Sequence, residues 1–146
     1  MKAISLTQPW AVLVANGEKK IDTRSWRTSY RGQLAIHASK KITDEAKQKF
    51  YNDRYFGESL KKLGVTNRGM LTTGAILAEV RLVDVVRTED TVESLSEKEI
   101  AFGDYTPGRW AWIFDSLVAF PSPVETKGGL GLWNWDDERT KPENKL

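Results

Sequence analysis

Residues 2–26 read KAISLTQPWAVLVANGEKKIDTRSW, and this stretch decides the fold. Its first five residues alternate in a way that predicts a short strand. A proline fits the first turn of a helix, where its missing N–H has no partner, and Thr7 is suited to cap that turn. The pattern therefore predicts a helix of about two turns that begins near Pro9 and ends at Gly17, with a second strand after it.

The rest of the chain continues mainly as strands. From Glu79 onward, charged residues alternate with valine or leucine, which predicts a strand with one buried face. Further strands are predicted over residues 20–25, 32–39, 73–87, 109–120 and 130–135, with a turn at 115–116. Helices are predicted over residues 43–63, with a break near Gly57, and from the capping box Ser96–Glu99 onward. Many strands and few helices in 146 residues predict an α+β, mainly β fold: a small β-barrel with peripheral helices.

The composition excludes several classes of protein. With 40% hydrophobic and 29% charged residues, the chain has the balance of a globular domain rather than a disordered segment. It has no cysteine and one histidine, His37, so disulfides, a thiol nucleophile and a multi-histidine metal centre are excluded. We expect no metal and no cofactor. The absence of a long apolar run or a signal-like start predicts a cytoplasmic protein without a membrane partner.

Charge is distributed unevenly along the chain. Residues 1–41 carry eight basic and two acidic residues, a balance of +6, whereas residues 70–146 carry eight basic and fourteen acidic residues, a balance of −6. Aromatic residues, among them Trp10, Trp26 and Tyr30, are interleaved with the early basic ones. This composition is typical of surfaces that bind nucleic-acid phosphates and bases. The alternative is a solvated basic face balanced by the acidic half.

Several motifs in the chain resemble the ASCH family, the activating-signal-cointegrator homology domains. The resemblance rests on Leu6-Thr7-Gln8-Pro9-Trp10-Ala11, on Gly17-Glu18-Lys19-Lys20-Ile21-Asp22-Thr23-Arg24-Ser25-Trp26, on Tyr30-Arg31-Gly32, on Ile36-His37-Ala38, on Gly108–Trp112 and on Gly129–Trp133. It implies a PUA-like barrel. It also implies one ASCH domain over residues 1–136, with a helical insertion near residues 41–71 and a polar tail over residues 137–146.

The resemblance also implies what the chain does. Members of the family are thought to bind RNA or other nucleic acid, and some are small enzymes, an N4-acetylcytidine amidohydrolase and a ribonuclease. The amidohydrolase branch uses a lysine, a nearby threonine and a later glutamate. Lys19 matches the lysine, Asp22 occupies the threonine position with Thr23 one residue further on, and no motif places the glutamate. A nucleic-acid-binding module is therefore the first hypothesis, and a metal-independent hydrolase is the second.

Individual residues suggest how such a site is built. We expect Gln8 to contact a base edge, Trp10 to stack on a base, and Lys19 either to bind phosphate or to act as a catalytic base with Asp22 as its partner. Further ligand-binding candidates are Arg24, Trp26, Arg27 and Arg31, which would form a phosphate-binding edge, and His37, which would hold a backbone group or orient Lys19.

Each of these interpretations has a structural alternative. An Asp22–Arg24 ion pair could pin a strand while Lys19 stays solvated. Because Lys19 follows Gly17 at the end of the first helix, we expect Lys19→Ala to damage function more than folding and to change stability by less than about 0.5 kcal/mol. Most of the six tryptophans are expected in the core, and the Lys127–Gly131 segment is expected to be a turn. Aromatic residues that bind a protein partner would give a third kind of function, an interaction module.

Overall fold

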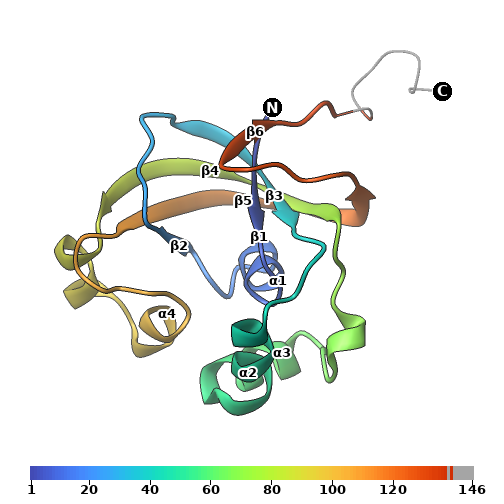
Figure 1. Ribbon diagram of the computed structural model, residues 1–146, viewed down its shortest axis with the longest axis horizontal. Helices are drawn as coiled ribbons and strands as arrows, with labels where there is room; N and C mark the ends of the chain where they lie inside the picture. The colour runs from blue at the N-terminus through green and yellow to red at the C-terminus, as the bar shows by residue number, and fades with distance from the viewer. Residues whose placement is uncertain (138, 140–146) are drawn as a thin grey trace.

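A six-stranded sheet forms the centre of the molecule, in a computed structural model that describes residues 1–137 and 139. The strands are β1 (Lys2–Leu6), β2 (Ile21–Arg24), β3 (Gly32–Ala38), β4 (Ala75–Arg87), β5 (Trp110–Glu125) and β6 (Leu132–Asn134). Their order is β2-β5-β4-β3-β1-β6, with β1 parallel to β3 and the other neighbours antiparallel. The sheet curls into a half-barrel (Figure 1), which confirms the expected α+β, mainly β fold of a small barrel with peripheral helices.

Four α-helices lie at the periphery of the sheet in the described residues: α1 (Trp10–Ala15), α2 (Asp44–Asn52), α3 (Arg54–Lys62) and α4 (Glu97–Ala101). Short 3-10 turns occupy Arg68–Met70, Thr88–Asp90 and Val92–Ser94. In Figure 1, α2 and α3 lie beside each other below α1, away from the sheet. None of the helices in the described part of the chain is both long enough and apolar enough to cross a membrane.

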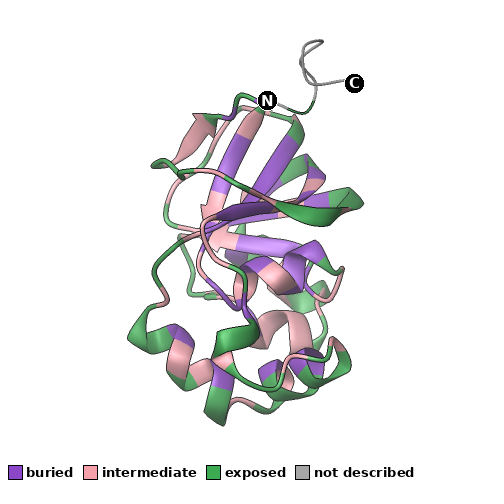
Figure 2. Cartoon of the chain, turned by 90° about the vertical axis from the view of Figure 1, so that its right-hand side faces the viewer, coloured by how far each residue is buried: buried purple, intermediate pink, exposed green. Residues whose placement is uncertain are grey.

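Helix α1 connects two hydrophobic clusters. Its Ala11 and Val14 pack with strand residues such as Trp112 in the core of the half-barrel, while Leu13 packs with Phe56 and other residues of the α2–α3 region. Figure 2 shows the buried residues along the strands and on the inner faces of the helices, with exposed residues on the outer turns. The two clusters fix α1, and hence the segment that follows it, against both the sheet and the outer helices.

Three local features differ from the sequence predictions. The helical region breaks at Asp53 rather than Gly57, because the Asp53 carboxylate accepts hydrogen bonds from the first amides of α3 and thereby caps it. The predicted turn near Ser116 is a left-handed residue, with φ of 54°, inside the single long strand β5. Helix α1 has Pro9 at its N-cap rather than Thr7. Most of the polar tail predicted over residues 137–146 lies outside the described residues.

Candidate functional site

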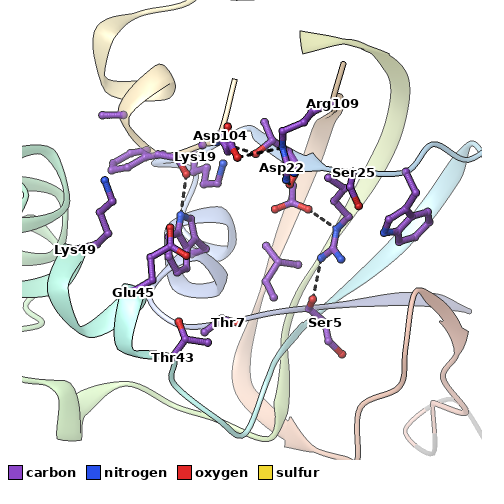
Figure 3. A pocket seen from close by; sticks show the side chains of 18 residues that line it. Ser5, Thr7, Lys19, Asp22, Ser25, Thr43, Glu45, Lys49, Asp104 and Arg109 are labelled. Carbon is purple, nitrogen blue, oxygen red and sulfur yellow. Dashed lines mark hydrogen bonds and ion pairs between the residues drawn. The ribbon is translucent and has the colours of Figure 1, made fainter. Parts of the chain in front are cut away.

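A cavity of about 490 Å³ opens where β1 and β2 approach the helices. In Figure 3, Glu45 and Lys49 of α2 lie on one side, and Asp22 and Ser25 lie on the other. The lining residues are Ser5, Leu6, Thr7, Trp10, Lys19, Asp22, Thr23, Arg24, Ser25, Trp26, Thr43, Glu45, Lys49, Ala101, Phe102, Gly103, Asp104 and Arg109. We call this cavity the central cleft. It brings together five of the sequence-predicted site residues: Trp10, Lys19, Asp22, Arg24 and Trp26.

Lys19 reaches the central cleft because the chain turns sharply after α1. Gly17 adopts φ of 77°, a left-handed conformation that favours glycine. The turn then allows the amides of Glu18 and Lys19 to donate to the Leu13 carbonyl at 2.9 and 3.1 Å. Lys19 is therefore held by the end of the helix and does not follow the alternation of β2, which begins at Ile21.

The Lys19 side chain is buried, and this corrects the expectation that it is solvated. The residue is 2% exposed, and its ammonium donates to the Ile21 carbonyl. Its Nζ lies 3.9 Å from Glu99 Oε2. Burial lowers the pKa of Lys19, against the opposing effect of the nearby Asp22 and Glu99 charges. A small stability change on Lys19→Ala is no longer expected, since alanine would leave a cavity beside a buried carboxylate.

Glu99 is a site residue that the sequence analysis did not place. Ser96 caps α4 by accepting a hydrogen bond from the Glu99 amide, as the capping-box pattern predicts. The Glu99 side chain instead accepts from the Lys20 amide at 2.8 Å and approaches Lys19. Burial raises the pKa of Glu99, and the Lys19 charge opposes that shift. Only the local role of Glu99 was visible in the sequence, because its contact with Lys19 spans distant segments.

Asp22 and Arg24 form the ion pair of the structural alternative, and both also line the central cleft. Arg24 Nε donates to Asp22 Oδ2 at 2.7 Å, and Nη2 donates to the Ser5 carbonyl at 2.9 Å (Figure 3). The guanidinium also lies over the rings of Trp26 and Trp112, 5.8 and 5.9 Å from their centroids. These contacts hold Arg24 in one orientation, with its side chain 20% exposed.

Several buried polar atoms near the central cleft have no hydrogen-bond partner among the described residues. They are the buried atoms Glu99 Oε2, Tyr105 Oη and Arg109 Nε. Burial, with the Glu99 and Asp22 charges, raises the pKa of Tyr105, which keeps its phenol protonated. Arg109 Nε lies 3.5 Å from Asp104 Oδ2. Buried donors and acceptors that form no hydrogen bond, even where an ion-pair partner lies 3.5–3.9 Å away, are suited to binding polar atoms of a ligand or ordered water.

The two tryptophans of the central cleft are anchored differently. Trp10 donates its indole N–H to the Phe102 carbonyl at 2.8 Å and packs edge-on against Phe56. Trp26 packs edge-on against the buried Trp112. Both Trp10 and Trp26 are partly exposed. Rigid, partly exposed rings at a cavity wall can stack on a planar ligand group at a low cost in conformational entropy.

Gln8 lies away from the central cleft. It is 0% exposed, its Nε2 donates to the Thr72 carbonyl at 2.8 Å, and its Oε1 accepts from the Val12 amide at 2.9 Å. The side chain amide thus connects the start of α1 to the segment before β4. Both of its polar atoms are used by the backbone, so the geometry favours a structural role over contact with a base.

We expect Gln8→Ala to destabilise the fold without changing the central cleft. The substitution leaves a buried carbonyl and a buried amide unpaired, at about 1–3 kcal/mol for each. Urea unfolding measures the change, with Asn16→Ala as the matched control, because the Asn16 amide also bonds α1 but is exposed. The control is expected to change stability by less than about 0.5 kcal/mol. A stable Gln8→Ala variant that loses RNA affinity would return Gln8 to the ligand-binding set.

Arg27, Arg31 and His37 also lie outside the central cleft. Arg27 is exposed and lies over the Trp110 ring, 5.4 Å from its centroid. Arg31 donates to two nearby carbonyls and lies 3.7 Å from Asp84. His37 is buried on β3, where its Nδ1 is 2.9 Å from Ser5 Oγ and its Nε2 is 2.9 Å from the Thr126 carbonyl.

Comparison with known proteins agrees with this architecture. The ASCH domain profile matches residues 4–124, which include most of β1, the whole of β2 to β4, the four α-helices of the described residues and most of β5. The chain is 47% identical over 38 residues to activating signal cointegrator 1 from Homo sapiens, and equally to that from Mus musculus. The matched stretch covers 26% of this chain and 6% of each relative. The chain thus corresponds to a small part of these relatives. From the profile match over most of its length, the chain belongs to the ASCH domain family.

Proposed function

We propose that this protein binds single-stranded nucleic acid, RNA in the first place, and holds one base or modified nucleoside in the central cleft. The observation that carries the proposal is the convergence of Trp10, Lys19, Asp22 and Arg24 on one cavity. The cavity volume of about 490 Å³ falls within the range of small-molecule sites. Membership of the ASCH family supports the same class of ligand.

The cleft offers each kind of contact that a nucleotide needs. Trp10 and Trp26 present ring surfaces to a base, and stacking on an aromatic ring contributes about 1–3 kcal/mol. Lys49 and Arg109 supply further positive charge at the cavity wall. The Asp22 carboxylate at the cavity wall supplies an acceptor for an exocyclic amino group, in the way that carboxylates recognise cytosine N4. Charge, stacking and hydrogen-bonding groups are therefore available in one place.

Titration of the purified protein with a fluorescein-labelled RNA octanucleotide tests the proposal. We expect saturable binding that weakens with salt. Contact with three to five phosphates gives a slope of log K against log salt of about −2 to −3.5, at about 0.7 per phosphate of a single strand. A DNA octanucleotide of the same sequence measures the preference for ribose. Absent binding, or binding that salt leaves unchanged, would contradict the proposal.

A second candidate, a metal-independent hydrolase, is favoured by the pair formed by Lys19 and Glu99. Burial lowers the pKa of Lys19 and raises that of Glu99, so the two pKa values lie closer together than those of an exposed lysine and an exposed glutamate. A neutral Lys19 amine can take a proton from an attacking water, and a protonated Glu99 can donate one to a leaving nitrogen or oxygen. Hydrolysis of an acylated nucleoside or of RNA is the reaction class that this pair suits.

Incubation with N4-acetylcytidine, and separately with labelled RNA, tests this second candidate without added metal. If the pair is catalytic, Glu99→Gln should lower turnover by about 10²- to 10⁴-fold, the usual contribution of a general acid or base. Glu97→Gln is a matched control, because Glu97 lies on the same helix and is exposed. An equal loss in both variants, or no turnover by the unmodified protein, would leave binding as the function.

A further inference from the structure

A second cavity, of about 710 Å³, lies beside the central cleft and shares Ser5 with it. Its walls come from the end of β3, the residues just before β4 and the segment between β5 and β6. The lining residues are Ser5, His37, Ser39, Lys40, Thr73, Gly74, Glu125, Thr126, Lys127, Gly128, Gly129 and Leu130. In Figure 1 the chain leaves β3 and continues to α2, so that residues 39–43 lead from the second cavity to the central cleft.

The floor of the second cavity is a fixed hydrogen-bonded chain. The Thr126 carbonyl can only accept, so His37 Nε2 carries the proton and Nδ1 accepts from the Ser5 hydroxyl at 2.9 Å. Ser5 Oγ in turn lies 3.2 Å from the Trp133 indole N–H, which donates to it. Burial lowers the pKa of His37, in keeping with a neutral ring. The chain connects β1, β3 and β6 to the segment after β5.

Two glycines hold that segment down on the floor. A Cβ on Gly128 would lie 2.7 Å from His37 Cε1 and 2.8 Å from Ser5 Oγ, and a Cβ on Gly129 would lie 2.8 Å from the Trp133 ring. Only a backbone without side chains can approach so closely. The segment connects β5 to β6 as an irregular stretch packed against the sheet, rather than as the turn that the sequence predicts. The wall of the second cavity is therefore formed before any ligand binds.

The groups that line this wall suit a phosphodiester backbone. Lys40 and Lys127 are exposed and form no ion pair with any carboxylate in residues 1–137 and 139. The amides of Gly128 and Gly129 also have no partner within that described part. Leu130 is 97% exposed and offers an apolar surface to a sugar or base. Glu125 lines the same cavity and opposes an anion there.

We propose that the second cavity binds the nucleotide next to the one held in the central cleft, so that a single strand passes along residues 39–43 from one cavity to the other. Lys40 and Lys127 contact its phosphates, and Leu130 packs against its sugar or base. This inference rests on the proposed function of the central cleft. It assigns the strand a path along the two cavities and not along the Arg27–Arg31 edge that the sequence indicated, since neither arginine lines either cavity.

Comparison of a mononucleotide with an RNA octanucleotide tests the path. Losing one phosphate contact on a single strand reduces the slope of log K against log salt by about 0.7. At about 0.1 M salt, about one decade below 1 M, this corresponds to an affinity about fivefold lower. We therefore expect Lys40→Ala/Lys127→Ala to weaken octanucleotide binding by up to about 25-fold, to reduce the salt slope by about 1.4, and to leave cytidine monophosphate binding unchanged. Glu125→Gln is expected to strengthen octanucleotide binding.

Matched variants make the outcome specific. Lys61→Ala/Arg81→Ala removes two exposed cations that line neither cavity, and it is expected to change octanucleotide affinity less than twofold. A Lys40→Ala/Lys127→Ala effect no larger than this control would overturn the inference. So would a loss of slope in Arg27→Ala/Arg31→Ala alone, or an equal loss for the mononucleotide. If the unmodified protein binds the mononucleotide and binds the octanucleotide no more tightly, the proposed path is wrong while the proposed site in the central cleft stands. If the protein binds neither ligand, both proposals are wrong.

Discussion

Lys19→Met is expected to lower RNA affinity about ten- to a hundredfold in a protein that still folds. Lys19 carries the positive charge at the floor of the central cleft, and a hydrogen bond to a charged group contributes about 1.5–3 kcal/mol. Methionine fills nearly the same volume, so the core keeps its packing while the buried charge is removed. RNA titration and thermal unfolding of the same sample measure the two effects. Lys20→Met is the matched control, since Lys20 is adjacent and exposed.

The pH dependence distinguishes the two roles of Lys19. Its pKa lies below the ordinary lysine value of 10.5, so the ammonium loses its proton at a lower pH than an exposed lysine does. If Lys19 binds phosphate, affinity falls as the pH rises through that lowered value. If Lys19 is a catalytic base, turnover rises over the same range. A Lys19→Met variant that binds RNA as well as the unmodified protein would exclude the phosphate-binding role, and a variant that also keeps the turnover of the unmodified protein would exclude the catalytic role.

Arg24→Met is expected to reduce both stability and RNA affinity. The substitution removes two hydrogen bonds and leaves Asp22, whose side chain is 12% exposed, without its cation. Because the pair is partly solvated, we expect a loss of about 1–3 kcal/mol in unfolding free energy, less than for a fully buried pair. The loss of a fixed guanidinium in the cleft is expected to lower RNA affinity at least about tenfold.

The double variant Asp22→Asn/Arg24→Met separates the two effects of Arg24. Removing both charges leaves no uncompensated carboxylate, so most of the stability should return, while RNA affinity stays low. Urea unfolding and RNA titration of the single and double variants complete the cycle. Recovery of both stability and affinity in the double variant would mean that Arg24 serves only to neutralise Asp22. Arg24→Lys is also expected to lower RNA affinity, because a lysine ammonium cannot bond to Asp22 and to the Ser5 carbonyl at the same time.

Sequence periodicity predicted the parts of this fold that alternate clearly. Strand β4 follows from the alternation after Glu79, and the first strand and helix follow from the apolar run and the turn at Gly17. The break at Asp53 was placed at Gly57 because glycine disfavours helix, whereas an aspartate that caps the next helix is the stronger determinant here. Strand β5 was divided at Ser116, where a left-handed residue is accommodated within the strand.

The candidate site was predictable only along its local stretch. Residues 19–26 are close in sequence, so Lys19, Asp22, Arg24 and Trp26 could be grouped before the structure was known. Glu99, Asp104 and Arg109 reach the same region from distant segments, and no local pattern reports such contacts. The burial of Lys19 was also missed, because it depends on how α4 packs over the turn after α1. The ligand-binding roles of Gln8, Arg27, Arg31 and His37, and the cytoplasmic location, stay predictions.

The indole N–H resonances of the tryptophans provide the most direct test of the central claim, that the cleft around Lys19 binds RNA. Trp10 and Trp26 report on the central cleft, Trp133 on the second cavity, Trp110 on the Arg27 edge, and the buried Trp135 serves as an internal control. In a ¹H–¹⁵N titration with an RNA octanucleotide, we expect saturable shifts at Trp10, Trp26 and the amides of Lys19–Arg24, with Trp135 unchanged. Shifts confined to Trp110, or none at Trp10 and Trp26 while RNA binds, would contradict the account.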